Sequence, residues 1–237
     1  PGLMEVVRIE GFGDSQSVVG TFTDGLSSVG EPTTISQATQ PITGLAAAAT
    51  VGGGLWAVWT VTPNADVDPV GIVIRRVPPD GAPKQSPMGV FAGAAAASRP
   101  AVAMATDSRG LVAWDQATPA GGKAIWAQRI AANGLLEGDP LVVHEEGDSP
   151  HLGAAVAPLG TGWVVVWEGP DEDSSGVLAR RLGADGQPVS AVFPVSADET
   201  GPQQTPTAAA LTDGRVIIIW RDGLGASASI RGRYLAP

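Results

Sequence analysis

The 237-residue sequence contains no cysteine, so it carries neither a disulfide framework nor thiol chemistry. Histidine occurs only twice. Basic residues are also scarce, because 14 Lys and Arg stand against 24 Asp and Glu, for a formal net charge of −10. Affinity for nucleic acid depends on neutralising phosphates, and no basic stripe is present here. We therefore expect no nucleic-acid partner.

Long apolar runs are missing as well. No stretch of 18 apolar residues lacks Gly, Pro or charge, so the sequence predicts no membrane span. It has no Gly-rich phosphate loop and no Ser–His arrangement that would indicate nucleophilic catalysis. Gly and Pro are plentiful, at 32 and 20 residues, and hydrophobic residues make up 43%. Such a composition is typical of many short strands joined by tight turns around a sizeable core.

One short apolar pattern recurs along the chain. It is clearest in residues 162–169, GWVVVWEG, and returns in modified form so that tryptophans fall at 59, 114, 167 and 220. One step further back, Ile9 takes the place of the tryptophan. A fixed period of this size is the signature of a repeat architecture. It predicts repeats at about 1–38, 39–98, 99–148, 149–204 and 205–237.

Each complete repeat reads as four short strands. In the third full copy we expect strands at 151–157, 163–167, 176–182 and 189–195, with a tight turn at Asp185-Gly186. The opening segment lacks a first strand, and the closing segment lacks a fourth. The sequence therefore predicts three four-stranded units flanked by two three-stranded ones.

A four-stranded sheet of about 50 residues cannot cover both of its faces alone, and radial stacking of like sheets covers them. We therefore predict an all-β fold, a single β-propeller domain of four-stranded antiparallel blades. The expected number of blades is five, with incomplete terminal blades. The alternative is a segment of a longer repeat array. The repeated tryptophans are expected to lie in the core between blades.

The motif resembles repeats of large secreted and surface proteins of bacteria. The residues that carry it are Pro150, Ala154, Ala155, Gly162, Val165, Val166, Trp167, Gly176, Arg180, Arg181, Asp185, Gly186, Pro188, Val189, Phe193, Val195 and Ser196. The resemblance covers nearly the whole chain. It implies an extracellular, cell-surface or periplasmic propeller module used in adhesion, assembly or recognition. It brings no catalytic residues and no cofactor.

Two acidic loops follow second strands and could bind Ca²⁺, which takes six to eight oxygen ligands. The candidates are Asp66 and Asp68 in one loop, and Asp171 and Asp173 in another. Neither loop has the full Asp-x-Asp-x-Asp-Gly spacing, so solvated turns are the favoured interpretation. His144 and His151, with acidic residues between them, could bind a transition metal. A plain polar connection is favoured there too.

The remaining candidates are basic and aromatic. Paired arginines recur in third strands, at Arg75-Arg76 and Arg180-Arg181, where they could capture anions or form structural salt bridges. The second interpretation is favoured. Trp126 breaks the repeat pattern, so it is the best candidate for an exposed binding aromatic.

Three functions follow from these features. The first, which we expect, is a non-catalytic module that binds a protein partner or assembles with itself, since open strand edges invite strand addition. The second is a lectin-like propeller that binds glycans, which predicts repeated exposed aromatic residues in the loops. The third is a glycosidase-like enzyme, which needs a pair of inner carboxylates. The sequence does not supply that pair.

Overall fold

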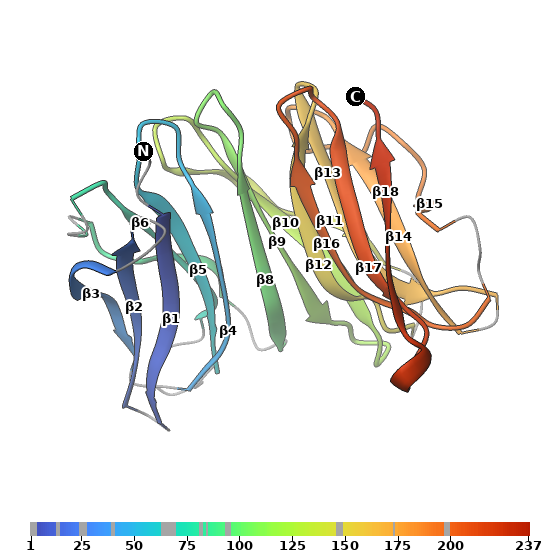
Figure 1. Ribbon diagram of the computed structural model, residues 1–237, viewed down its shortest axis with the longest axis horizontal. Coiled ribbons are helices and arrows are strands. Elements are labelled where there is room, and N and C mark those ends of the chain that lie inside the picture. Colours follow the sequence, from blue (N-terminus) through green and yellow to red (C-terminus); the bar gives the residue numbers. More distant parts are fainter. Residues whose placement is uncertain are drawn as a thin grey trace. The chain divides into compact units, whose positions relative to one another are not determined.

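The computed structural model describes residues 4–12, 15–23, 28–38, 41–62, 70–80, 83, 85–92, 96–145, 149–172, 174–196 and 200–237. Within these residues the chain forms eighteen strands and one short 3-10 helix, η1 (Gly225–Ser227). The strands make five antiparallel sheets (Figure 1). The all-β prediction is confirmed. Across the described ranges, no helix has the length and apolar character needed to cross a bilayer.

Three of the sheets have four strands, and the two at the ends of the chain have three. The first has the order β1 (Met4–Phe12), β2 (Ser15–Thr23), β3 (Ser28–Ala38), and the second β4 (Ile42–Ala49), β5 (Leu55–Val61), β6 (Val70–Val77), β7 (Met88–Ala92). The third has the order β11 (Leu136–His144), β10 (Lys123–Ile130), β9 (Gly110–Ala117), β8 (Ala97–Met104). The fourth has β12 (Leu152–Leu159), β13 (Gly162–Pro170), β14 (Ser175–Leu182), β15 (Phe193–Pro194), and the fifth β16 (Gln203–Ala210), β17 (Val216–Asp222), β18 (Ser229–Leu235). This is the predicted pattern of strands.

The chain divides into two compact units. One comprises Pro1–Gly110 with Ile130–Leu136, and the other Leu111–Arg129 with Glu137–Pro237. Each unit has its own apolar core, and each core contains repeat tryptophans. In the first unit Trp59 packs with Val18, Ile35 and Leu55.

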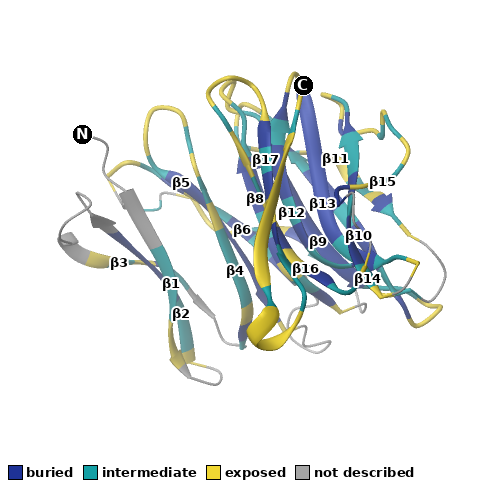
Figure 2. Ribbon diagram, turned by 45° about the vertical axis from the view of Figure 1, so that its right-hand side comes forward, coloured by how far each residue is buried: buried dark blue, intermediate teal, exposed yellow. Residues whose placement is uncertain are grey.

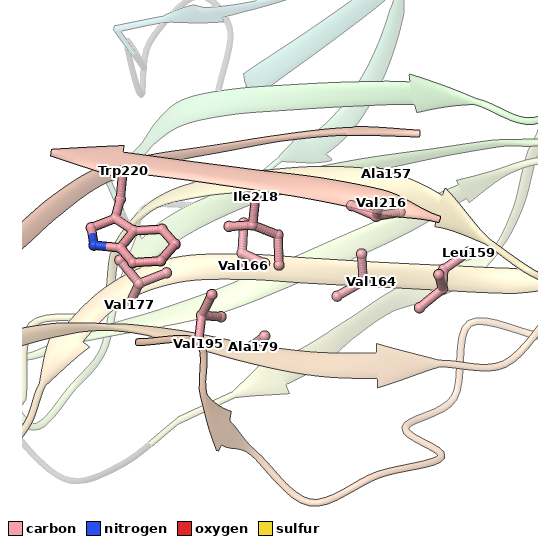
Figure 3. Packing of buried hydrophobic residues seen from close by; sticks show 10 residues of the cluster. All are labelled: Ala157, Leu159, Val164, Val166, Val177, Ala179, Val195, Val216, Ile218 and Trp220. Carbon is pink, nitrogen blue, oxygen red and sulfur yellow. The ribbon is translucent and has the colours of Figure 1, made fainter. Parts of the chain in front are cut away.

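The core of the second unit lies between the fourth and fifth sheets. Figure 3 shows Val216, Ile218 and Trp220 pointing from β17 toward Val164 and Val166 of β13. Alternate residues of a strand point to opposite faces of its sheet, so the spacing 216, 218, 220 places all three on one face. Burial of apolar area of this kind is the main term that stabilises a sheet pair.

Second strands differ in how many faces they bury. Every residue of β5 is buried, and so are the first six residues of β13, as their continuous apolar sequences predict. In β17, by contrast, buried and more exposed residues alternate from Val216 to Trp220. Within its unit, the fifth sheet is covered by the fourth sheet on one face only.

The fourth strand of the fourth sheet is much shorter than predicted. We expected a strand over residues 189–195, but only Phe193 and Pro194 form β15. An isolated bridge joins Leu182 to Pro188. Proline lacks the N–H that a sheet ladder needs, so Pro188 and Pro194 limit regular pairing on this edge.

The tight turns follow the expected chemistry where the structure describes them. Gly134 and Gly186 have positive φ, at 83° and 80°, a conformation that costs little without a Cβ. The preceding polar side chains close the turns, because the Leu135 N–H donates to Asn133 Oδ1 and the Gln187 N–H donates to Asp185 Oδ1, both at 3.0 Å. Asn-Gly and Asp-Gly are thus confirmed as hairpin signals.

Candidate functional site

A cavity of about 450 Å³ lies where β13 passes into β14 in the second unit. Asp171 and Glu172, directly after β13, line it together with Gly176 and Leu178 of β14. Asp171 is held in place because its Oδ1 accepts a hydrogen bond from the Ser174 N–H at 2.8 Å. Gly176 leaves room for the carboxylate, since a Cβ at this position would lie 2.8 Å from Asp171 Oδ2. The local backbone therefore presents a fixed carboxylate at the cavity.

Gln203, the first residue of β16, lines the same cavity. Its side chain is fully buried, at 0% exposure. The amide Nε2 donates to the Gly201 carbonyl oxygen at 2.8 Å. Among the described residues, Gln203 Oε1 and Asp171 Oδ2 have no hydrogen-bond partner. Buried polar atoms in proteins are nearly always paired, so two such acceptors at one cavity call for an explanation.

Of the four calcium candidates, only Asp171 lies among the described residues. Asp66, Asp68 and Asp173 lie outside the described residues. Asp171 lines the cavity, but the part of the chain that the structure describes contains no group of three or more His, Cys, Asp or Glu residues able to hold a metal ion. The sequence interpretation of Asp171 as a solvated turn needs correction, because its Oδ2 atom is buried against Gly176.

The two histidines form an aromatic cluster with Trp167. The indole Nε1 donates to His151 Nδ1 at 3.2 Å, and the His144 ring stacks on the indole with centroids 5.4 Å apart. The two imidazole rings meet edge to face at 4.5 Å. His151 is completely buried. The interpretation of these histidines as a plain polar connection is therefore wrong, because the chain folds His151 back against the repeat tryptophan.

A buried ion pair lies within the third sheet, and a hydrogen bond links its carboxylate to the fourth sheet inside the second unit. Asp115 of β9 is fully buried, and its Oδ2 lies 2.6 Å from the ammonium of Lys123 at the start of β10. The other carboxylate oxygen accepts a hydrogen bond from the Gly153 N–H of β12 at 3.3 Å. The lysine side chain is partly exposed. Removal of Lys123 would therefore leave the buried charge of Asp115 without its ionic partner, whereas removal of Asp115 would leave Lys123 with access to water.

The recurring third-strand arginines bind the backbone of the preceding sheet. The guanidinium of Arg75 donates to the Ile35 carbonyl oxygen, that of Arg180 to Val143 at 2.6 Å, and that of Arg233 to Val195 at 2.8 Å. Desolvation lowers the pKa of Arg75 from its ordinary value. The expected salt bridges to acidic residues are thus wrong for these three contacts, because backbone carbonyl groups accept from the guanidinium groups instead. We refer to these contacts as arginine staples.

Removing one arginine staple is expected to destabilise the second unit. Arg180→Ala loses the bond to Val143 and a second bond from Nε to the Ser190 carbonyl oxygen at 3.1 Å. Hydrogen bonds to charged groups contribute about 1.5–3 kcal/mol, and we expect a loss of that size in urea denaturation. Arg181→Ala is the control, because its bond to the Ala236 carbonyl is exposed and should cost less than about 1 kcal/mol. Equal effects of the two changes would contradict the special role of Arg180.

Two carboxylates sit in hairpin turns and have lowered pKa values. A side-chain hydrogen bond from Arg109 lowers the pKa of Asp107, and one from Arg215 lowers the pKa of Asp213. Each arginine Nε donates to its carboxylate at 2.8 Å. A general acid needs a raised pKa instead. Each carboxylate therefore has a structural role in its turn, and its lowered pKa is the opposite of the shift that a general acid needs.

Trp126 lies in the middle of β10 and its side chain is half-buried. The sequence pattern marked it as the best candidate for an exposed binding aromatic. The structure places it in a strand, whereas binding aromatics of a lectin-like propeller were expected in loops. Its role in binding stays a prediction.

The outer edge of the fifth sheet is open. β18 pairs with β17 from Ser229 to Leu235, and among the residues that the structure describes no strand pairs with the other edge of β18. Figure 2 colours this C-terminal strand as exposed along nearly its whole length. Ile230 and Tyr234 are 73% and 57% exposed. A cavity of about 480 Å³ beside this edge is lined by Ile218, Arg233 and Leu235, together with residues 193–196.

No family model matches the sequence, and no curated protein matches it. Solved structures do resemble it. An endo-arabinase from Bacteroides thetaiotaomicron has a TM-score of 0.55 at 11% identity, covering 100% of this chain and 93% of that one. An α-L-arabinanase from Penicillium chrysogenum, complexed with arabinobiose, has a TM-score of 0.59 at 11% identity, covering 96% and 74%. A thermostable family-43 glycoside hydrolase has a TM-score of 0.53 at 9% identity, covering 98% and 90%.

At these identities the likeness shows the fold, a five-bladed β-propeller. The predicted fold class is therefore confirmed. The resemblance to secreted and surface repeat proteins of bacteria is not matched by any sequence family, so it stays a prediction together with its extracellular setting.

Gln203 was not among the candidates predicted from the sequence, although a signal was present. In the fifth sheet Gln203 pairs with Asp222, two residues after Trp220, just as Ile42 pairs with Val61, two residues after Trp59. The two residues thus occupy the same repeat position, which is buried in both sheets. Aligning the repeats by register would have shown an amide where another sheet has an apolar side chain.

Proposed function

We propose that this chain is a non-catalytic propeller module that binds an extended segment of a protein partner along the open edge of β18. The observation that carries the proposal is this edge itself: the strand ends a three-stranded sheet and is exposed over its length. Unpaired N–H and C=O groups of an edge strand are a template for strand addition.

The other sheets indicate what the added segment should resemble. In the three four-stranded sheets the place next to the third strand holds β7, β11 or β15. A buried valine marks this place in each sheet: Val90 in β7, Val143 in β11 and Val195 directly after β15. The segment is therefore expected to be short and extended, with one β-branched residue that becomes buried. The cavity beside Arg233 and Leu235 offers space for one of its side chains.

Direct binding tests this proposal. A labelled peptide copying residues 136–144, the nine-residue strand β11, serves as the probe, with a scrambled peptide of the same composition as its control. We expect saturable binding of the first peptide, measured by fluorescence anisotropy, and an increase in the melting temperature of the protein because a ligand of the native state stabilises it. Equal binding of the two peptides would contradict strand addition.

A matched pair of variants locates the site. The double variant Ile230→Lys with Tyr234→Lys places charge on the edge and removes two exposed side chains that would contact the bound peptide. Cross-strand pairs of this kind contribute about 0.2–1 kcal/mol each. We expect affinity for the peptide to fall roughly fivefold. Val51→Lys is the control, because Val51 is as exposed but lies in a hairpin of the first unit. Unchanged affinity in the edge variant would place the peptide elsewhere.

The absence of catalysis is a separate part of the proposal. The buried carboxylate Asp115 is engaged by Lys123, and the pKa values of Asp107 and Asp213 are lowered rather than raised. Some of the solved structures that the chain resembles are described as arabinanases. We therefore expect no reducing sugar to be released from arabinan or xylan. Release of reducing sugar by the wild-type chain, together with its loss in the variant Asp171→Asn, would overturn this part.

A further inference from the structure

The cavity beside Asp171 and Gln203 has an unusual polar lining. Two carboxylates, Asp171 and Glu172, face it, and Gln203 adds an amide oxygen. No Lys, Arg or His is among the described residues that line it. Ser149 and Ser196 complete the polar lining with hydroxyl groups, which can accept as well as donate. The described lining therefore presents mainly hydrogen-bond acceptors and negative charge, with no cationic side chain to balance them. Its volume of about 450 Å³ is within the range of small-molecule sites.

The buried amide oxygen shows which polar group the cavity lacks. Gln203 is fully buried and its Nε2 is already engaged with the Gly201 carbonyl. This bond fixes the orientation of the amide, because reversing it would place Oε1 against that carbonyl oxygen. Gln203 Oε1 is left as an acceptor without a partner among the described residues. Pairing this oxygen requires a hydrogen-bond donor from outside the described residues.

We propose that this cavity binds a small aliphatic ammonium ion, with the charged nitrogen between Asp171 and Gln203 Oε1. An ammonium group carries three donors and no acceptor, which matches a lining of acceptors. Pro170, Val177, Leu178 and Pro194 form the apolar part of the lining and accept the alkyl chain.

Two other ligand classes fit less well. A sugar presents both donors and acceptors, and no aromatic side chain is among the described lining residues to stack on its ring. A bare Ca²⁺ ion needs six to eight oxygens at 2.3–2.6 Å, as a general rule, and would leave most of this cavity empty. Charge and lining together therefore favour an organic cation. This site is distinct from the strand edge, so either proposal can fail without the other.

Chemical-shift mapping of the ¹⁵N-labelled chain tests the proposal. The probes are n-butylammonium chloride, the neutral isostere 1-butanol, glucose and CaCl₂, all at constant ionic strength. We expect saturable shifts of Asp171, Gly176 and the Gln203 side-chain amide with n-butylammonium only. Equal shifts with 1-butanol, or saturable binding of glucose or Ca²⁺ at these residues in place of the ammonium ion, would overturn the proposal, as would the absence of any shift.

Variants test the two named acceptors. Gln203→Leu removes the amide oxygen and Asp171→Asn removes the charge, and each is expected to weaken n-butylammonium binding roughly tenfold or more. Asp185→Asn is the matched control, because it makes the same change of charge in a turn whose side chain only accepts a bond from the Gln187 N–H. If Gln203→Leu does not fold, Asp171→Asn and the comparison of n-butylammonium with 1-butanol still decide the question. Equal loss of binding in Asp171→Asn and Asp185→Asn would overturn the assigned site.

Discussion

Replacing Lys123 by Met is expected to lower the free energy of unfolding by about 3–5 kcal/mol, the cost of leaving a buried charge without its ionic partner. Asp115 is 0% exposed and accepts the ammonium of Lys123 at 2.6 Å. Its other carboxylate oxygen accepts a hydrogen bond from the Gly153 N–H at 3.3 Å, which is long for a bond to a carboxylate. Urea denaturation followed by circular dichroism measures the change.

The reverse substitution separates this explanation from a simple loss of packing. Asp115→Asn removes the buried charge, and the partly exposed Lys123 can then turn to water. We expect Asp115→Asn to cost less than Lys123→Met, and the double variant to be more stable than Lys123→Met alone. Such non-additivity is what a direct contact produces. A double variant with the full sum of both losses would contradict the proposed dependence.

An exposed ion pair provides the control for Lys123. Arg215 and Asp213 lie 2.7 Å apart in a hairpin turn, and both side chains are nearly half exposed. Surface pairs of this kind contribute little to stability because water and salt screen them. Arg215→Met should therefore have a small effect. If Arg215→Met lowers the free energy of unfolding as much as Lys123→Met does, burial does not determine how much an ion pair contributes to stability.

Replacing Trp167 by Ala is expected to cost about 3–5 kcal/mol, the range found when a large buried aromatic side chain is removed. Trp167 is fully buried, stacks with His144 and donates to His151 Nδ1. The change creates a cavity and also leaves a buried imidazole nitrogen without its donor. Thermal and urea denaturation of the variant check the prediction.

Trp167→Phe separates the two parts of this loss. Phenylalanine keeps much of the apolar volume but has no N–H for His151, so the expected cost is about 1–3 kcal/mol. Trp126→Phe is the matched control, because Trp126 is only half-buried in β10 and should lose about 1 kcal/mol or less. If Trp167→Phe behaves like this control, the hydrogen bond to His151 contributes nothing measurable.

The strands were predictable because the same apolar pattern recurs in each repeat and has to be buried in each sheet. The apolar run before each tryptophan marked β5, β9 and β13, and the four tryptophans are buried as expected. The Asn-Gly and Asp-Gly turns were predictable because the chemistry of a two-residue turn is local. The length of β15 was not, since two prolines interrupt a strand whose apolar pattern continues.

The candidate site was predicted only in part. Asp171 was recognised as an acidic loop residue, but Gln203, which lies 32 positions later, was not. Their meeting depends on the packing of β16 against the end of β13, and no local pattern encodes that contact. The arginine pairs were noticed in the sequence, but their carbonyl partners on the preceding sheet could not be read from it. The motif showed at which positions arginine recurs, but it did not show which backbone carbonyl groups the arginine side chains contact.

By itself the sequence determined the all-β class, the number of sheets and the order of strands, because a period of about 53 residues and the apolar run before each tryptophan are properties of the chain alone. The tertiary structure decided which buried polar groups meet. Asp115 finds Lys123 across a hairpin, Trp167 reaches back to His151, and Arg180 reaches the Val143 carbonyl 37 residues earlier. These contacts depend on strand register and on the packing of one sheet against the next, which fix atomic distances that sequence spacing does not contain.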